Sequence, residues 1–119
     1  MKTENIKFKA KELGTGKWKE GFLQRDMDYN LCILIAKKEE HSWYWTQIDP
    51  STVCMFTGLK DKNETPIYEG DIVMHKDNNA ERRGDINWDS KAAAFCFGQD
   101  FLVHYHSEDM VVVGNKFDK

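Results

Sequence analysis

Residues 56–73 read FTGLKDKNETPIYEGDIV, and this stretch predicts strands separated by turns. A polar connection follows Phe56, and within it Gly58 and Asn63 are the residues best able to adopt a positive φ. A second, tighter turn is expected at Glu69-Gly70, between two short apolar segments. Apolar segments punctuated in this way are typical of β structure.

The same β pattern extends outward to both ends of the chain, because apolar and polar residues alternate with a period of two. At residues 6–11, Ile6 and Ala10 fall on one face of the predicted strand while Lys7, Lys9 and Lys11 fall on the other. Further strands are predicted at residues 18–24, 31–37, 43–48, 52–56, 67–68, 71–74, 84–89, 92–97, 101–106 and 110–113. The fold class predicted from this pattern is mainly β.

Asp49-Pro50-Ser51 interrupts the pattern, since proline cannot donate a hydrogen bond to a strand ladder. We therefore expect a single domain over residues 1–119 with two lobes. Residues 1–50 form an N-terminal β lobe, which packs on a small C-terminal β-barrel lobe at residues 51–119. The second lobe has about five short strands, which are enough to form a closed or half-closed barrel.

Composition narrows the class of protein. The chain of 119 residues has 17 Lys and Arg against 20 Asp and Glu, a net charge of −3, so a nucleic-acid site would have to be a local patch. The longest apolar run, residues 31–36, is far shorter than the roughly 20 residues that cross a bilayer. The three widely spaced cysteines (Cys32, Cys54 and Cys96) favour buried thiols in a reducing compartment. We expect a cytoplasmic protein without a membrane partner.

The quoted stretch resembles the signature of the YopX-type family of phage and prophage proteins, in which FTGLKDKNG is followed by IYEGDIV. Glu64 stands where that pattern usually has glycine, which leaves Asn63 to form the turn. The resemblance implies a phage- or prophage-encoded protein in a bacterial host cell, with a C-terminal part similar to Src-homology-3-like folds, and it implies no reaction. The signature residues matched here are Thr57, Gly58, Leu59, Asp61, Asn63, Tyr68, Glu69, Gly70 and Asp71.

The carboxylates of this signature could in principle serve acid–base chemistry or bind a hard cation, because Glu69 and Asp71 are two residues apart. Turn formation explains them more simply, since an Asp side chain accepts hydrogen bonds from nearby backbone N–H groups. We therefore predict structural roles for Glu69 and Asp71, and likewise for Asp61 and Asn63.

The histidines are the other candidates for chemistry. On the predicted strand 101–106, His104 and His106 would share a face and could chelate a metal if His75, Glu108 or Cys96 approached. Two ligands do not make a metal site, so we predict no metal and no cofactor. No nucleophile–base arrangement is recognisable either, and we predict that the protein is not an enzyme.

The N-terminal region offers the best case for a ligand surface. Lys7, Lys9 and Lys11 form a row, Trp18 lies nearby in sequence, and Trp43 and Trp45 share a strand face. A lysine row beside exposed aromatic rings is how single-stranded nucleic acid is bound. The alternative is a strand kept soluble by lysines, with the tryptophans in the core or in a subunit contact.

Two functions remain after this survey. The first, which we favour, is a non-enzymatic accessory protein that forms a homo-oligomer and binds a host or phage macromolecule. Paired β edges and aromatic side chains buried between copies would support it. The second is a nucleic-acid-binding module that uses the lysine row and the tryptophans.

Overall fold

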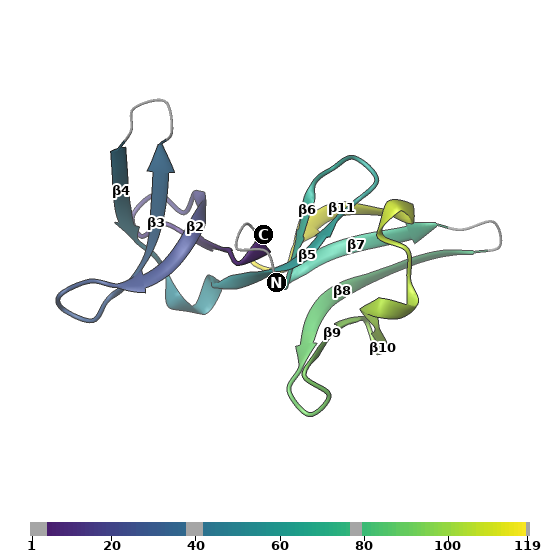
Figure 1. Cartoon of the computed structure of the whole chain (residues 1–119). Coiled ribbons are helices and arrows are strands. Elements are labelled where there is room, and N and C mark those ends of the chain that lie inside the picture. Colours follow the sequence, from purple (N-terminus) through teal and green to yellow (C-terminus); the bar gives the residue numbers. More distant parts are fainter. Residues whose placement is uncertain (1–4, 38–41, 77–79, 119) are drawn as a thin grey trace. The chain divides into compact units, whose positions relative to one another are not determined.

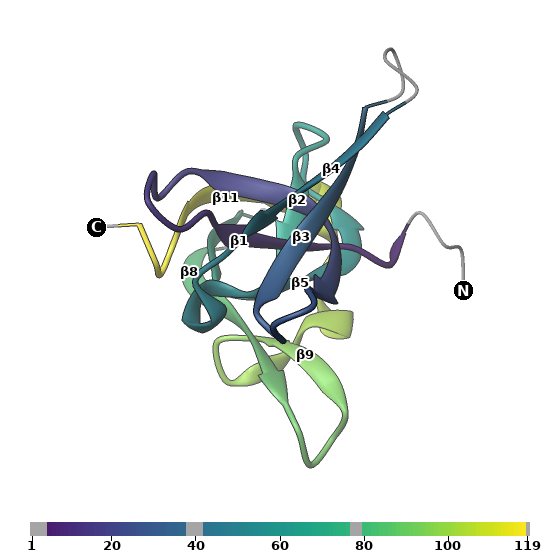
Figure 2. The same cartoon turned by 90° about the vertical axis from the view of Figure 1, so that its left-hand side faces the viewer.

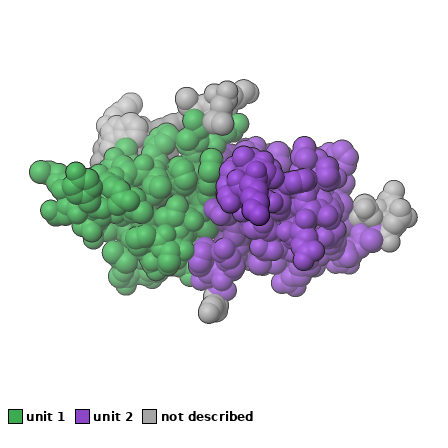
Figure 3. All heavy atoms as spheres, turned by 90° about the horizontal axis from the view of Figure 1, so that it is seen from below, with its two compact units in different colours: residues 1–55 green, residues 56–119 purple. Residues whose placement is uncertain are grey.

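The computed structural model describes residues 5–37, 42–76 and 80–118, and it confirms the prediction of a mainly β protein (Figure 1). Antiparallel strands and short 3-10 helices make up the described part, which contains no α-helix. The chain divides into two compact units, residues 1–55 and residues 56–119 (Figure 3). The division falls within β5 (Cys54–Lys60), whereas the expected break at Pro50 forms the short 3-10 helix η3 (Pro50–Thr52).

Unit 1 is a curved antiparallel sheet. Its strands are β1 (Phe8–Lys11), β2 (Trp18–Arg25), β3 (Leu31–Lys37), β4 (Ser42–Gln47) and the start of β5, in the spatial order β4-β3-β2-β1-β5 (Figure 2). The end of β1 also meets the end of β4, where the N–H of Leu13 donates to the carbonyl of Gln47 over 3.0 Å and Glu12 forms a bridge with Ile48. The sheet therefore curls around a core of its own.

The core of unit 1 is formed by alternate residues of these strands. Ala10, Ile33 and Ile48 are completely or almost completely buried. The side chains of Phe8, Leu23, Leu31, Ile35 and Val53 pack against them. Because side chains alternate across a strand, the residues between these positions point to the other side of the sheet.

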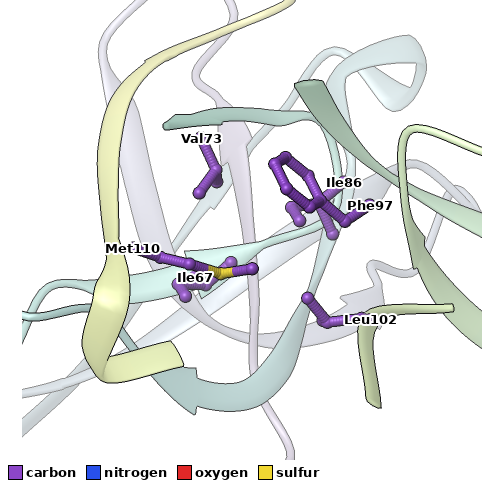
Figure 4. Packing of buried hydrophobic residues seen from close by; sticks show 6 residues of the cluster. All are labelled: Ile67, Val73, Ile86, Phe97, Leu102 and Met110. Atoms are coloured by element: carbon purple, nitrogen blue, oxygen red, sulfur yellow. The ribbon is translucent and has the colours of Figure 1, made fainter. Parts of the chain in front are cut away.

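Unit 2 contains the remaining strands and two 3-10 helices. These elements are β6 (Pro66–Tyr68), β7 (Asp71–Lys76), β8 (Glu81–Asp89), β9 (Ala94–Phe97), β10 (Asp100–Phe101), η4 (Leu102–His104), η5 (Ser107–Asp109) and β11 (Met110–Asn115). Five strands form an antiparallel sheet in the order β10-β9-β8-β7-β11, and β6 pairs with β5. The side chains that converge in its core are Ile67, Val73, Ile86, Phe97, Leu102 and Met110 (Figure 4).

Two of the strand predictions were wrong. Residues 101–106 are not a strand, because after Phe101 the chain makes a 3-10 turn that is closed by a bond from the N–H of Tyr105 to the carbonyl of Leu102. Three residues per turn place Leu102 and Tyr105 on the core and leave Val103 exposed. The polar connection after Phe56 is shorter than expected, since β5 continues to Lys60, which pairs with Pro66.

Candidate functional site

The pairing register of unit 1 brings most of the predicted ligand surface to one side of the sheet. Lys9 lies opposite Glu20 and Lys11 lies opposite Trp18. Farther along the sheet, Phe22 lies opposite Leu34, and Leu34 lies opposite Trp45. Directly paired residues point to the same side. The side facing away from the core of unit 1, here called the outer face, carries Lys9, Lys11, Trp18, Glu20, Phe22, Leu34 and Trp45.

The lysines of the outer face are held by Trp18. The Nζ atoms of Lys9 and Lys11 lie 4.7 Å and 5.5 Å from the centre of the Trp18 ring, within the range of cation–π attraction. Two ammonium groups therefore cover the Trp18 ring. The ring orients the two lysines and does not offer a free surface for base stacking. Lys7 is half-buried and lies just before β1, because the strand begins at Phe8 and not at Ile6 as predicted.

Three apolar side chains form a row across the outer face. Phe22 on β2, Leu34 on β3 and Trp45 on β4 follow one another in register. Phe22 is 48% exposed and Trp45 is 54% exposed, and Leu34 between them is half-buried. Sequence reasoning identified Trp45 but missed Phe22 and Leu34. The alternation of Trp18, Glu20 and Phe22 was a usable signal for Phe22.

Trp43 is the one predicted surface residue whose side chain is not placed on or off the outer face. Its backbone pairs with Ala36 in the β3–β4 ladder. Its side chain lies outside the described part of the structure.

The family signature folds around Asp61, which is buried with 4% of its surface exposed. Oδ1 accepts hydrogen bonds from the backbone N–H groups of Asn63 and Thr65, at 2.8 and 2.9 Å. Oδ2 accepts one from the N–H of Val112 on β11, over 2.9 Å. The carboxylate thus closes its own turn and ties that turn to a strand 51 residues later in the chain.

Asp71 has a similar role one turn later. Its Oδ2 accepts from the N–H of Tyr68 over 2.8 Å, and its Oδ1 accepts from Nδ2 of Asn115 over 3.0 Å. Gly70 has a φ of +89°, which agrees with the predicted tight turn, and the half-buried Glu69 precedes it. Both oxygens of Asp71 are occupied in holding the β6–β7 turn and the end of β11.

The beginning of the signature forms an irregular strand. The hydroxyl of Thr57 donates to the carbonyl of Ile67 over 2.7 Å, which pins β5 to β6. Gly58 has the predicted positive φ, +88°, where the β5–β6 register shifts, and Leu59 beside it is 37% exposed. The ring of Tyr68 is buried and packs against Phe56, with ring centres 5.5 Å apart.

The histidines of unit 2 do not form the arrangement considered from sequence. His104 ends η4 and His106 precedes η5, so they are not neighbours on one strand face. His75 is buried, and its ring packs edge-on against Tyr105 with ring centres 5.1 Å apart. Among the residues that the structure describes, no three His, Cys, Asp or Glu side chains are grouped to hold a metal ion.

A polar network links β8, β10 and the 3-10 turns of unit 2. Arg82 forms an ion pair with Asp100 over 2.7 Å, and the hydroxyl of Tyr105 donates to the same carboxylate oxygen over 2.7 Å. The Tyr105 hydrogen bond, followed by the Arg82 guanidinium, lowers the pKa of Asp100. The same carboxylate raises the pKa of Tyr105, so the phenol is a weaker acid than usual. The network holds Tyr105 over the core.

Cys32, Cys54 and Cys96 are buried thiols that are not joined in disulfides, as predicted. Burial raises the pKa of the Cys32 thiol, and the Asp26 carboxylate adds to this effect. Burial also raises the pKa of Cys96, with further contributions from Asp89 and Asp100. Because the thiolate is the reactive form, these shifts make both groups poorer nucleophiles at neutral pH.

Residues 7–119 match the family described as YopX protein. The chain belongs to the YopX family. No curated protein matches it. In this YopX-family chain, the carboxylates of Asp61 and Asp71 accept hydrogen bonds from within the fold. The exposed aromatic row lies outside the signature, on the outer face of unit 1. No helix in the described residues is long and apolar enough to cross a membrane.

Glu64 shows how this YopX-family chain accommodates its departure from the signature. Glu64, and not Asn63 as predicted, adopts the positive φ of the turn, at +64°. This conformation is strained for a residue with a side chain and unstrained for glycine. The position that carries glycine in the resembled pattern therefore keeps its left-handed backbone in this chain.

Replacing Glu64 by glycine is expected to raise the free energy of unfolding by about 0.5–1 kcal/mol, because relief of the left-handed strain exceeds the added entropy of the unfolded chain. Urea unfolding of the two proteins measures the difference. Asn63→Gly is the matched control and is expected to destabilise, since Asn63 has no positive φ. A less stable Glu64→Gly variant would contradict this account of the turn.

Proposed function

We propose that this YopX-family protein is a non-enzymatic accessory protein of a phage or prophage, acting in the cytoplasm of a bacterial host by self-association and by binding another macromolecule. The observation that supports it is the row of Phe22, Leu34 and Trp45 on the outer face. Phe22 and Trp45 are about half exposed, and Phe22 stands on a strand whose other side packs Leu23 against the core. Covering the exposed part of each ring would stabilise a complex by about 2 kcal/mol.

The non-enzymatic part of the proposal is supported by what the ionisable groups already do. The carboxylate oxygens of Asp61 and Asp71 accept hydrogen bonds that hold turns and strands together. The pKa values of the Cys32 and Cys96 thiols are raised. Catalytic groups have pKa values shifted towards the protonation state that their reaction needs. A raised thiol pKa disfavours the nucleophilic thiolate, and the two carboxylates are engaged in hydrogen bonds of the fold.

Self-association is supported by the edge of β4. This strand ends the sheet order of unit 1, and β3 is its ladder partner among the described strands. Its last residue, Gln47, accepts a hydrogen bond from the N–H of Leu13. A strand at the end of a sheet that carries an exposed aromatic residue, as β4 carries Trp45, can pair with a second copy of the same strand.

Native mass spectrometry of gently purified protein tests this proposal. We expect an oligomer, and we expect Trp45→Lys to shift it to the monomer, because two lysines would face each other across the paired edges. The matched control is Val103→Lys, which places the same charge at an exposed apolar position of unit 2 and should keep the oligomer. A weak dimer typically has a Kd of about 1 μM. If the wild type remained a monomer at every concentration up to about 100 μM, self-association would be overturned.

A further inference from the structure

We infer that the macromolecule bound by the outer face is a single-stranded nucleic acid, with bases stacked on Phe22 and Trp45 and phosphates contacted by Lys9 and Lys11. This inference rests on the proposed function, because it takes the outer face as the binding surface. Of the residues that it uses, Phe22 is not among the candidates identified from the sequence.

The charge of the surface supports a polyanion as the ligand. Residues 1–55 contain nine Lys and Arg against eight Asp and Glu, whereas residues 56–119 contain eight against twelve. The net negative charge of the chain therefore comes from unit 2, and unit 1 has a small net positive charge. On the outer face itself Lys9 and Lys11 stand side by side on β1, and Glu20 opposite Lys9 offsets part of their charge.

The lysines are positioned for phosphate contact. Trp18 holds both Nζ atoms over its ring, so the two ammonium groups are oriented together before any ligand arrives. Lys9 is a diagonal neighbour of Phe22, since Phe22 is two residues beyond Glu20. Diagonal neighbours lie about 7–8 Å apart, within reach of a long side chain. A base on Phe22 would thus bring its phosphate to Lys9.

The aromatic residues are positioned for successive bases. Phe22 and Trp45 stand two strands apart in one row, which is a separation of about 10 Å. Both rings are half exposed, while the Trp18 ring is occupied by the lysines. Stacking requires unpaired bases whose flat faces are accessible, and a duplex does not present these. The arrangement therefore favours a single strand over a double helix.

Fluorescence anisotropy with labelled oligothymidine and oligouridine tests the inference, with a duplex of the same length as comparison. We expect both single strands to bind in preference to the duplex, and the two arms show whether DNA or RNA is favoured. Phe22→Ala is expected to weaken binding about tenfold, the loss of one base–aromatic stack. The double variant Lys9→Glu, Lys11→Glu should lower the salt dependence of log K by about 0.7 per lysine.

Matched controls come from unit 2. Phe101→Ala removes a ring that is 40% exposed, and Lys91→Glu reverses an exposed charge, and neither should change the affinity. Circular dichroism checks that each variant folds. If the wild-type protein self-associated but bound no oligonucleotide, this inference would be overturned and the proposed function would stay in place. Equal affinity for the duplex, or wild-type affinity in Phe22→Ala, would also overturn it.

Discussion

Replacing Asp61 by alanine is expected to lower the free energy of unfolding by about 4 kcal/mol, since hydrogen bonds to a charged acceptor contribute roughly 1.5–3 kcal/mol each and are not fully additive. The carboxylate is buried and accepts from three backbone N–H groups, those of Asn63, Thr65 and Val112. Alanine would leave these three donors without the carboxylate that joins the turn to β11. The loss is a large share of the 5–15 kcal/mol that stabilises a typical domain.

Asp61→Asn is the informative companion to this variant. The amide oxygen can still accept from Asn63 and Thr65, but the amide nitrogen would face the N–H of Val112. We expect a loss of about 2 kcal/mol, between wild type and alanine. Urea unfolding followed by circular dichroism measures both. If Asp61→Ala unfolded like the wild type, the signature would need an explanation other than turn stability.

The second large effect is expected at Gly21 on β2. A methyl group there would overlap the carbonyl oxygen of Leu34 and lie 2.9 Å from Cγ2 of Ile33. The overlap involves backbone, which cannot rotate away as a side-chain tip can. Gly21→Ala is therefore expected to destabilise the protein by at least about 3 kcal/mol. The close approach also positions Phe22 against Leu34, so this glycine supports the row on the outer face.

Gly114→Ala is the control for Gly21→Ala. Gly114 also lies in a strand, and a methyl group there would meet nothing within 4 Å. This variant is expected to be neutral or more stable by about 0.5 kcal/mol, through the reduced entropy of the unfolded chain. Thermal unfolding of both proteins makes the comparison. Equal stabilities for the two variants would mean that β3 can move away from Gly21 at little cost.

The sequence was sufficient for features that depend on neighbouring residues. Alternation predicted the strands of unit 1 to within a few residues, and turn chemistry predicted the positive φ of Gly58 and Gly70. It failed at residues 101–106, which alternate in the way expected of a half-buried strand. In the structure a 3-10 turn brings Leu102 and Tyr105 to the core instead. It also failed at Glu64, because the bonds that Asp61 accepts from Asn63, Thr65 and Val112 fix the turn and override the preference of Asn63.

The candidate surface was only partly predictable, because it depends on register. The lysine row is local to one strand and was visible in sequence. The row of Phe22, Leu34 and Trp45 comes from three strands, and only the pairing of β2 with β3 and of β3 with β4 brings it together. The covering of Trp18 by Lys9 and Lys11 likewise follows from the β1–β2 register. A shift of one residue would have moved each of these side chains to the core.

If the protein acts by association through unit 1, its subunit number should change in Trp45→Lys and stay the same in Val103→Lys. Native mass spectrometry across a dilution series gives this number for each protein. We expect an oligomer for the wild type and for Val103→Lys, and a monomer for Trp45→Lys. An oligomer that persists in Trp45→Lys but dissociates in Val103→Lys would contradict it, and would transfer the contact surface to unit 2.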